Sequence, residues 1–190
     1  MIELSTGPAA TRAAAPRVSV LCDANGWRRA FPRPISFLRE VARNSLIGGR
    51  DPAASGHDEL SLVLTDDARQ QELNRAWRGR DKPTNVLSFP DGTEMPDGTR
   101  LLGDVVLALE TCRREAREQN KSLADHAAHL VVHGVLHLLG HDHEVPEEAE
   151  AMERLEVQLL AGMGIADPYT ETLVPRRREP KSDLERKLAD

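Results

Sequence analysis

The sequence predicts a single domain of the α/β (α+β) class, with a mixed four-stranded sheet packed against about five helices. Segments with strand-like alternation exchange with segments of helical periodicity, in the order β-α-β-α-β-β-α-α-α. At 190 residues the chain is long enough for one domain with its own core. Hydrophobic residues make up 39% and charged residues 29%, which is typical of a globular protein.

Four strands are expected where apolar side chains alternate with polar ones or form a short apolar run. RVSVLCD and ELSLVLTDD alternate, NVLSFP is stopped by a proline, and LLGDVVLAL is apolar enough for the interior of a sheet. Before the last strand, DGTEMPDGTR holds two Asp-Gly pairs and a proline, which predict a loop over 91–100. The expected strands are 17–23, 59–67, 85–90 and 101–109.

Five helices are expected from their periodicity and their end signals. Pro34 suits the first turn of the first helix, and the Thr65-Asp66-Asp67 run supplies a cap for the second, which runs to about residue 77. The fourth is apolar, carries the histidines and ends at Gly140. The first, third and fourth helices are expected at 34–46, 110–120 and 123–139, and the fifth, which begins with acidic residues, at 146–164.

Both ends of the chain are expected to lie outside the folded domain, which we place at residues 17–168. Residues 1–16 are rich in Ala, Thr and Pro and indicate a flexible lead-in, and residues 169–190 form a charged, flexible tail. The net charge of −6 gives no general attraction to nucleic acid. A polyanionic substrate would therefore need a local basic surface.

The cysteine count and the hydropathy indicate a reducing compartment. Cys22 and Cys112 form no C-x-x-C arrangement, so we expect two buried thiols and no disulfide partner. The chain has no apolar run of about 18 residues and its N-terminal segment lacks the pattern of a secretory signal. We therefore expect a cytoplasmic protein without a membrane partner.

The segment HGVLHLLGHDH, residues 133–143, carries the clearest chemistry. His133 and His137 lie one helical turn apart on one face, and Gly140 lets the chain turn back so that His143 reaches the same point. Three imidazoles with a fourth position open to water are typical of catalytic Zn²⁺. The spacing therefore predicts one zinc ion per chain.

Neighbouring residues allow alternatives. His129 is either a partner of the metal ligands or a hydrogen-bonded core residue, and His141 competes with His143 as third ligand. His143 is preferred because the residues after Gly140 give the chain room to turn. Asp142 either orients an imidazole or caps the turn. We expect the two remaining histidines on the surface; they are His57 and His126.

Gly134 occupies the position where zinc peptidases with this histidine spacing carry their general-base glutamate. Losing that base should cost a peptidase about 10²–10⁴-fold in rate, because the amide nitrogen must be protonated to leave. Phosphodiester cleavage depends more on neutralising charge on the phosphoryl oxygens. The glycine therefore favours phosphoester over peptide chemistry.

A basic connector precedes the third expected strand, and offers the cations that phosphoester chemistry needs. The alternative is an ordinary solvated surface loop. Its basic residues are Arg75, Arg78, Arg80 and Lys82.

Taken together, HGVLHLLGHDH, WRGRDKPTNVLSFP and LLGDVVLAL resemble the YbeY family of bacterial endoribonucleases, over about residues 59–160. The resemblance implies zinc ligands at His133, His137 and His143, an active-site arginine at Arg78, and a mixed sheet with helices around a metal-bearing cleft. It also implies cleavage of single-stranded RNA in 16S rRNA 3′-end maturation and ribosome quality control. The implied partners are the 16S rRNA precursor, the small ribosomal subunit, and ribosomal or GTPase assembly proteins.

The resulting hypothesis is a zinc-dependent endoribonuclease in which the metal, with its ligand His133, and Arg78 act on the phosphodiester. The general base stays open between Asp104, in the fourth expected strand, and Asp142. Two rival functions remain. One is a zinc hydrolase for peptides or small phosphoesters, and the other is a non-catalytic ribosome-assembly factor with a structural metal.

Overall fold

The computed structural model describes residues 15–51, 57–143 and 145–170; the rest of the predicted lead-in and tail lies outside these ranges. All four expected strands and all five expected helices are present there. The strands are β1 (Arg17–Cys22), β2 (His57–Thr65), β3 (Val86–Pro90) and β4 (Thr99–Ala108). The helices are α1 (Pro34–Gly49), α2 (Asp67–Arg78), α3 (Leu109–Glu118), α4 (Leu123–Leu138) and α5 (Pro146–Gly162), with a short 3₁₀ helix, η1 (Trp27–Arg29).

The strands form one mixed sheet in the order β1-β2-β4-β3, which confirms the predicted architecture. β1 pairs with β2 and β2 with β4 in parallel, while β3 runs antiparallel to β4 at the edge. β4 begins at Thr99, inside the predicted loop, because the ladder with β2 already pairs His57 with Thr99. The loop therefore ends two residues earlier than its sequence pattern suggests.

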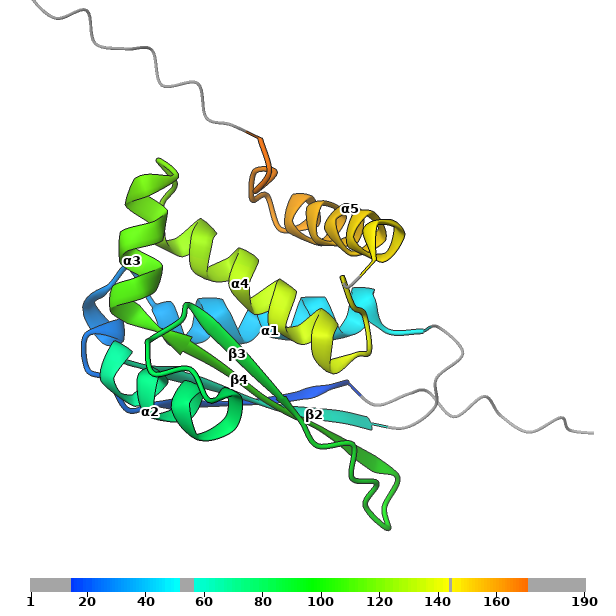
Figure 1. Cartoon of the computed structure of the whole chain (residues 1–190). Helices are drawn as coiled ribbons and strands as arrows, with labels where there is room; N and C mark the ends of the chain where they lie inside the picture. The colour runs from blue at the N-terminus through cyan, green and yellow to red at the C-terminus, as the bar shows by residue number, and fades with distance from the viewer. Residues whose placement is uncertain (1–14, 52–56, 144, 171–190) are drawn as a thin grey trace, which may run out of the picture.

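One face of the sheet is covered by α1 and α4, and α5 lies over these two helices on the side away from the strands (Figure 1). The core between these layers is aliphatic, as the low aromatic content of 3% requires. β2 contributes its alternate residues Leu60, Leu62 and Leu64, each at most 1% exposed. η1 adds Trp27, whose indole N–H donates to the Thr65 carbonyl at 2.8 Å.

α4 is apolar around most of its circumference because it packs against the sheet, α1, α3 and α5. Its start is capped by Ser122, whose hydroxyl accepts from the Asp125 N–H at 3.0 Å. Its end is set by Gly140, at a φ of +91° that favours glycine. The expected turn after the helix is therefore confirmed, and it returns the chain toward the helix face that carries His133 and His137.

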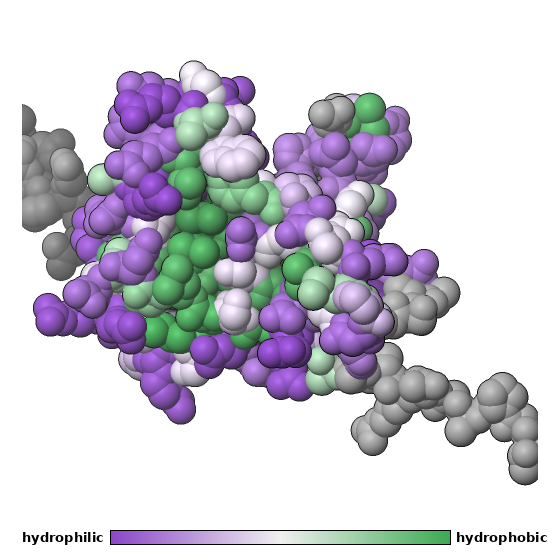
Figure 2. Space-filling view, turned by 90° about the horizontal axis from the view of Figure 1, so that it is seen from below, coloured by the Kyte–Doolittle hydropathy of each residue, from purple (hydrophilic) through white to green (hydrophobic). Residues whose placement is uncertain are grey.

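The other face of the sheet is covered in part by α2. Figure 2, which views the molecule from below, shows an apolar area on this side. A cavity of about 570 Å³ lies there, lined mainly by side chains of β1, β2, α2, β3 and β4. Two of its apolar side chains are open to solvent, Leu21 at 59% and Trp77 at 72% exposure.

Both cysteines are free thiols. Cys112 is fully buried, and burial raises the pKa of its thiol far above the ordinary value. Cys22 is only partly buried because it ends the edge strand β1, so the expectation of two buried thiols holds for Cys112 alone. Among the helices of the described residues, none is long and apolar enough to cross a membrane.

Candidate metal centre

Three histidines from α4 and the turn after it converge on one point. His133 and His137 project from the same face of α4, and their ring centroids lie 4.5 Å apart. The turn at Gly140 brings the ring of His143 to 4.9 Å from that of His137. Each residue offers one ring nitrogen, and these nitrogens all lie within 4.8 Å of one another. The arrangement is therefore able to hold one metal ion.

The protons on these rings decide which nitrogens face the common point. The Nδ1 of His137 lies 3.1 Å from the carbonyl oxygen of His141, and the Nδ1 of His133 lies 2.8 Å from Oε1 of Glu156. A carbonyl and an ionised carboxylate only accept hydrogen bonds, so both Nδ1 atoms must donate. If each ring is neutral, its single proton is on Nδ1, and its Nε2 has a free lone pair.

Those two Nε2 atoms, of His133 and His137, lie only 3.1 Å apart. Two lone pairs facing each other at this distance repel unless a cation lies between them. Two nitrogens bound to one tetrahedral zinc ion at about 2.1 Å would be separated by about 3.4 Å, close to the observed distance. Burial, followed by the neighbouring His133 and His143, lowers the pKa of His137, which favours the neutral ligand form.

Behind the histidines lies a buried carboxylate that the sequence patterns did not single out. Glu156 of α5 is 1% exposed, and its two oxygens contact His133 at 2.8 Å and His129 at 2.9 Å. The phenol of Tyr169 also donates to Oε2 of Glu156. Burial raises the pKa of Glu156, but these hydrogen bonds outweigh it and lower the pKa to about 2.

A signal for Glu156 does exist in the sequence. The buried residues of α5 are Met152, Glu156 and Leu160, which recur at every fourth position. A glutamate in such an apolar stripe needs a buried partner. Tyr169 carried no comparable signal, and it lies one residue beyond the predicted domain end at 168.

The structure places the alternative residues around the histidines as follows. His141 points its Nε2 at the carbonyl of Gly49, 3.3 Å away, so it is His143 that joins the cluster. His129 contacts Glu156 and thereby lies next to the ligand set. Asp142 accepts the backbone N–H of His143 at 2.7 Å, the turn-capping alternative.

Gly134 has a packing role that spacing alone did not reveal. A Cβ built at this position would lie 2.7 Å from Cγ1 of Val105 and 3.1 Å from Oγ of Ser88. The Ser88 hydroxyl donates to the Gly134 carbonyl at 3.2 Å, which ties α4 closely to β3. A glutamate in the peptidase position would therefore collide with the sheet.

The histidines open into a cavity of about 550 Å³ that includes Arg78, at the end of α2. β3 contributes alternate residues to its wall, which places the arginine and the histidines around one edge strand. The lining residues are Arg78, Val86, Ser88, Pro90, His133, His137, Gly140, His141, Asp142 and His143. Arg75, Arg80 and Lys82 are exposed and lie outside this lining.

Asp104 is separated from the histidines. Successive side chains of β4 point to opposite faces of the sheet, and Val105 faces α4. Asp104 accordingly lines the cavity on the α2 side, whereas Asp142 lines the histidine cavity. The structure thus brings one of the two carboxylates considered as general base to the site.

The expectation of two surface histidines is wrong for His126, which is 3% exposed. Its Nε2 lies 2.9 Å from Oε2 of Glu115, a partner on α3 that fills the polar requirement of a buried ring. His57 is half-buried at the start of β2. The packing of α3 against α4 buries His126, and the periodicity of either helix alone does not predict it.

Fold and site together define a small α/β protein with a three-histidine centre for a metal ion at the end of a buried helix. The family model for endoribonuclease YbeY matches residues 38–164. The chain therefore belongs to the YbeY family.

Named relatives agree over most of the chain. Endoribonuclease YbeY of Paramagnetospirillum magneticum is 52% identical over 159 residues, which cover 81% of this chain and 94% of the relative. Endoribonuclease YbeY of Azorhizobium caulinodans is 51% identical over 154 residues, covering 80% and 95%. The solution structure of TM1509 from Thermotoga maritima matches with a TM-score of 0.50 at 23% identity, over 77% of this chain and 91% of that one, and supports the fold.

Proposed function

We propose that this protein is a zinc-dependent endoribonuclease that cleaves single-stranded RNA. In this proposal the enzyme acts in the cytoplasm, in 16S rRNA 3′-end maturation and ribosome quality control. Its partners are the small ribosomal subunit and the assembly proteins of that subunit. Family membership and the name shared by the relatives support the reaction. The observation that supports the metal requirement is the 3.1 Å separation of the Nε2 atoms of His133 and His137, in rings whose Nδ1 atoms both face acceptor oxygens.

One zinc ion per chain would be held by His133, His137 and His143, whose donor set and spacing fit it. When bound, zinc supplies a Lewis acid that polarises a phosphoryl oxygen or water. The protein's own contribution is to orient the rings of His133 and His137 through the acceptors at their Nδ1 atoms. Asp142, at the rim of the same cavity, is our candidate for accepting a proton from the attacking group.

Arg78 supplies the positive charge that a phosphodiester needs. Arg78 lines the same cavity as the histidines, on an otherwise acidic protein, and a guanidinium can bind phosphate oxygens in a fork geometry. The exposed Arg75, Arg80 and Lys82 extend this charge along the end of α2 and the connector after it. They would hold the RNA backbone on either side of the cleaved bond.

The test of this function is His137→Ala, which removes the ligand at the centre of the cluster. We expect the purified variant to lose zinc, measured by elemental analysis, together with cleavage of single-stranded RNA. The matched control is His57→Ala, a histidine outside the cavity, which should keep both properties.

Other outcomes would select a rival function. Full RNA cleavage by metal-free His137→Ala would exclude the zinc mechanism. Peptide hydrolysis or hydrolysis of small phosphoesters by the pure protein, lost in His137→Ala while RNA stays intact, would indicate another zinc hydrolase. Co-sedimentation with the small ribosomal subunit that persists in the variant, without any cleavage by the wild type, would indicate a non-catalytic assembly factor.

A further inference from the structure

We propose that Glu156 is a positioning residue for the metal centre, which holds His133 with its Nε2 turned toward the ion. The inference rests on the three-histidine zinc site proposed above, and deepens it by assigning a role to a residue on a different helix. It starts from a residue that has no apparent reason to be charged, since Glu156 is 1% exposed in the apolar stripe of α5.

The two oxygens of the Glu156 carboxylate bind different partners. Oε1 lies 2.8 Å from Nδ1 of His133, while Oε2 receives both His129, at 2.9 Å, and the phenol of Tyr169. With Oε2 committed to two donors, the carboxylate cannot turn without breaking both bonds. Oε1 is therefore held in a fixed position next to Nδ1 of His133.

A fixed acceptor at Nδ1 has two effects on His133. It keeps the ring proton on Nδ1, so that Nε2 stays free to bind a metal, and it stops rotation of the ring out of the cluster. The negative charge also makes the imidazole a stronger electron donor. The Nδ1 of His137 is held in the same way by the carbonyl of His141. Two of the three ligands therefore have a hydrogen-bond acceptor at the ring nitrogen that faces away from the metal.

The competing explanation is that Glu156 only joins α5 to α4. Such a role would change the stability of the metal-free fold and leave the zinc affinity of the folded protein unaltered. The positioning role changes the affinity itself, because an unlocked ring must be ordered when the ion binds. Zinc affinity, measured at a temperature where every variant is folded, distinguishes the two.

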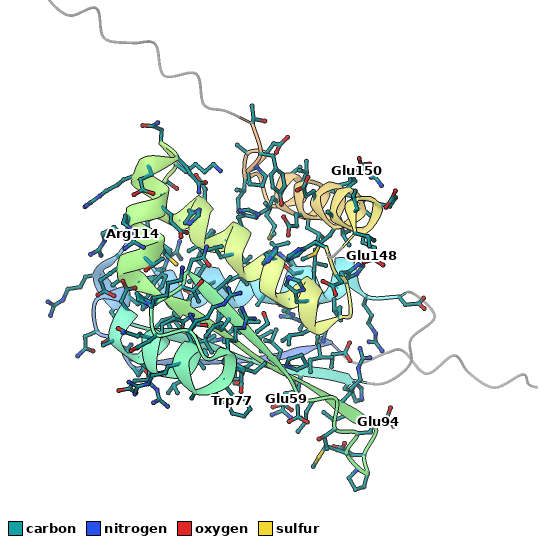
Figure 3. All side chains as sticks on the ribbon, viewed as in Figure 1. Glu59, Trp77, Glu94, Arg114, Glu148 and Glu150 are labelled. Atoms are coloured by element: carbon teal, nitrogen blue, oxygen red, sulfur yellow. The ribbon has the colours of Figure 1, made fainter. Side chains whose placement is uncertain are left out.

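The experiment compares Glu156→Gln with Glu150→Gln on the same helix. Glu150 points away from the body of the protein, 72% exposed beside Arg154, so its replacement removes the same charge without touching the site (Figure 3). Zinc dissociation constants are measured by competition with a chromophoric chelator, and folding is checked by circular dichroism. We expect about 10- to 100-fold weaker zinc binding for Glu156→Gln and no change for Glu150→Gln.

Unchanged zinc affinity in folded Glu156→Gln would overturn the positioning role while leaving the zinc site intact. If the wild type itself bound no zinc, the proposed function would fail first and this inference with it. Should Glu156→Gln not fold, Tyr169→Phe decides the matter, since it removes one hydrogen bond from the same carboxylate at a half-exposed side chain. About threefold weaker zinc binding would then support the role, and wild-type affinity would overturn it.

Discussion

The candidate site residues differ in which cavity of the fold they line. Of the basic residues in the connector, Arg78 lines the histidine cavity, whereas Arg80 is exposed outside it. Of the two aspartates considered as general base, Asp142 lines this cavity and Asp104 the one behind the sheet. Residue type predicted the set of candidates, and position in the fold separated them.

The separation predicts different kinetics for two neighbouring arginines. Arg78→Ala should keep its zinc but lower kcat for RNA cleavage by about 10²–10³-fold, because charge on the phosphoryl group loses its partner. Arg80→Ala should raise KM a few-fold and leave kcat unchanged, since in the proposed complex it would contact only the RNA backbone beside the cleaved bond. Steady-state kinetics on a short single-stranded RNA checks both, and wild-type kcat in Arg78→Ala would remove this residue from the site.

Among the elements, α4 decides the geometry of the centre. It packs against the sheet, α1, α3 and α5, and its close approach to the sheet depends on Gly134, where Ser88 and Val105 leave no room for a Cβ. The approach brings His133 and His137 to the wall formed by alternate residues of β3 and to the end of α2. The glycine that suggested a change of chemistry is thus also required by packing.

Gly134→Ala sets helix propensity against this packing. Alanine in a helix interior gains about 1 kcal/mol over glycine, but a new methyl group in a tight core costs about 1–3 kcal/mol. Val105 is fully buried and its branched side chain rotates little, so the packing cost should prevail.

We therefore expect a lower free energy of unfolding for Gly134→Ala in urea titrations. The control, Gly162→Ala in the last turn of α5, places its Cβ in open space and should be neutral or stabilising. A Gly134→Ala variant as stable as the wild type would show that α4 can shift to make room.

At the scale of the whole molecule, partly buried polar contacts join α3 to α4 and to the start of β3. Glu115 on α3 accepts from Asn85, just before β3, at 2.9 Å, and contacts His126 of α4 at the same distance. Burial raises the pKa of Glu115, but the hydrogen bonds from His126 and Asn85 outweigh it and lower the pKa below its ordinary value of 4.5. The folded protein therefore prefers the ionised carboxylate.

This preference makes the stability depend on pH in a definite direction. A lowered carboxyl pKa contributes stability above the ordinary value, and the contribution is lost as the pH falls through the folded-state pKa. Glu115→Gln should therefore reduce the free energy of unfolding by about 1–2 kcal/mol near pH 7, with a smaller difference in acid.

Urea unfolding of wild type and variant, near pH 7 and again in acid below the folded-state pKa of Glu115, measures the difference in the free energy of unfolding. Glu118→Gln, exposed on the same helix, is the control and should behave as wild type. A Glu115→Gln deficit that stays constant into acid would mean that the ionised carboxylate does not contribute.

Much of this organisation was predictable because its signals are local. Helical and strand periodicity, the capping position at Asp66 and the turn at Gly140 all depend on neighbours in the chain. The histidine cluster belongs to the same category, since its spacing lies within a single helix and the turn after it. The contacts of Glu156 and Tyr169 were missed because their partners come from distant segments, and the burial of His126 was missed because it depends on how α3 packs against α4.

By itself, the sequence determined the element order, the mixed α/β architecture and the three histidines that meet, because backbone propensity and helical periodicity act over a few residues. Tertiary structure alone decided which charged groups share their cavity. The packing of α4 and α2 on opposite faces of the sheet separated Asp104 from the histidines, the packing of α5 on α4 brought Glu156 behind His133, and the edge position of β3 let Arg78 reach the site. Such contacts depend on how whole elements pack, which no local pattern encodes.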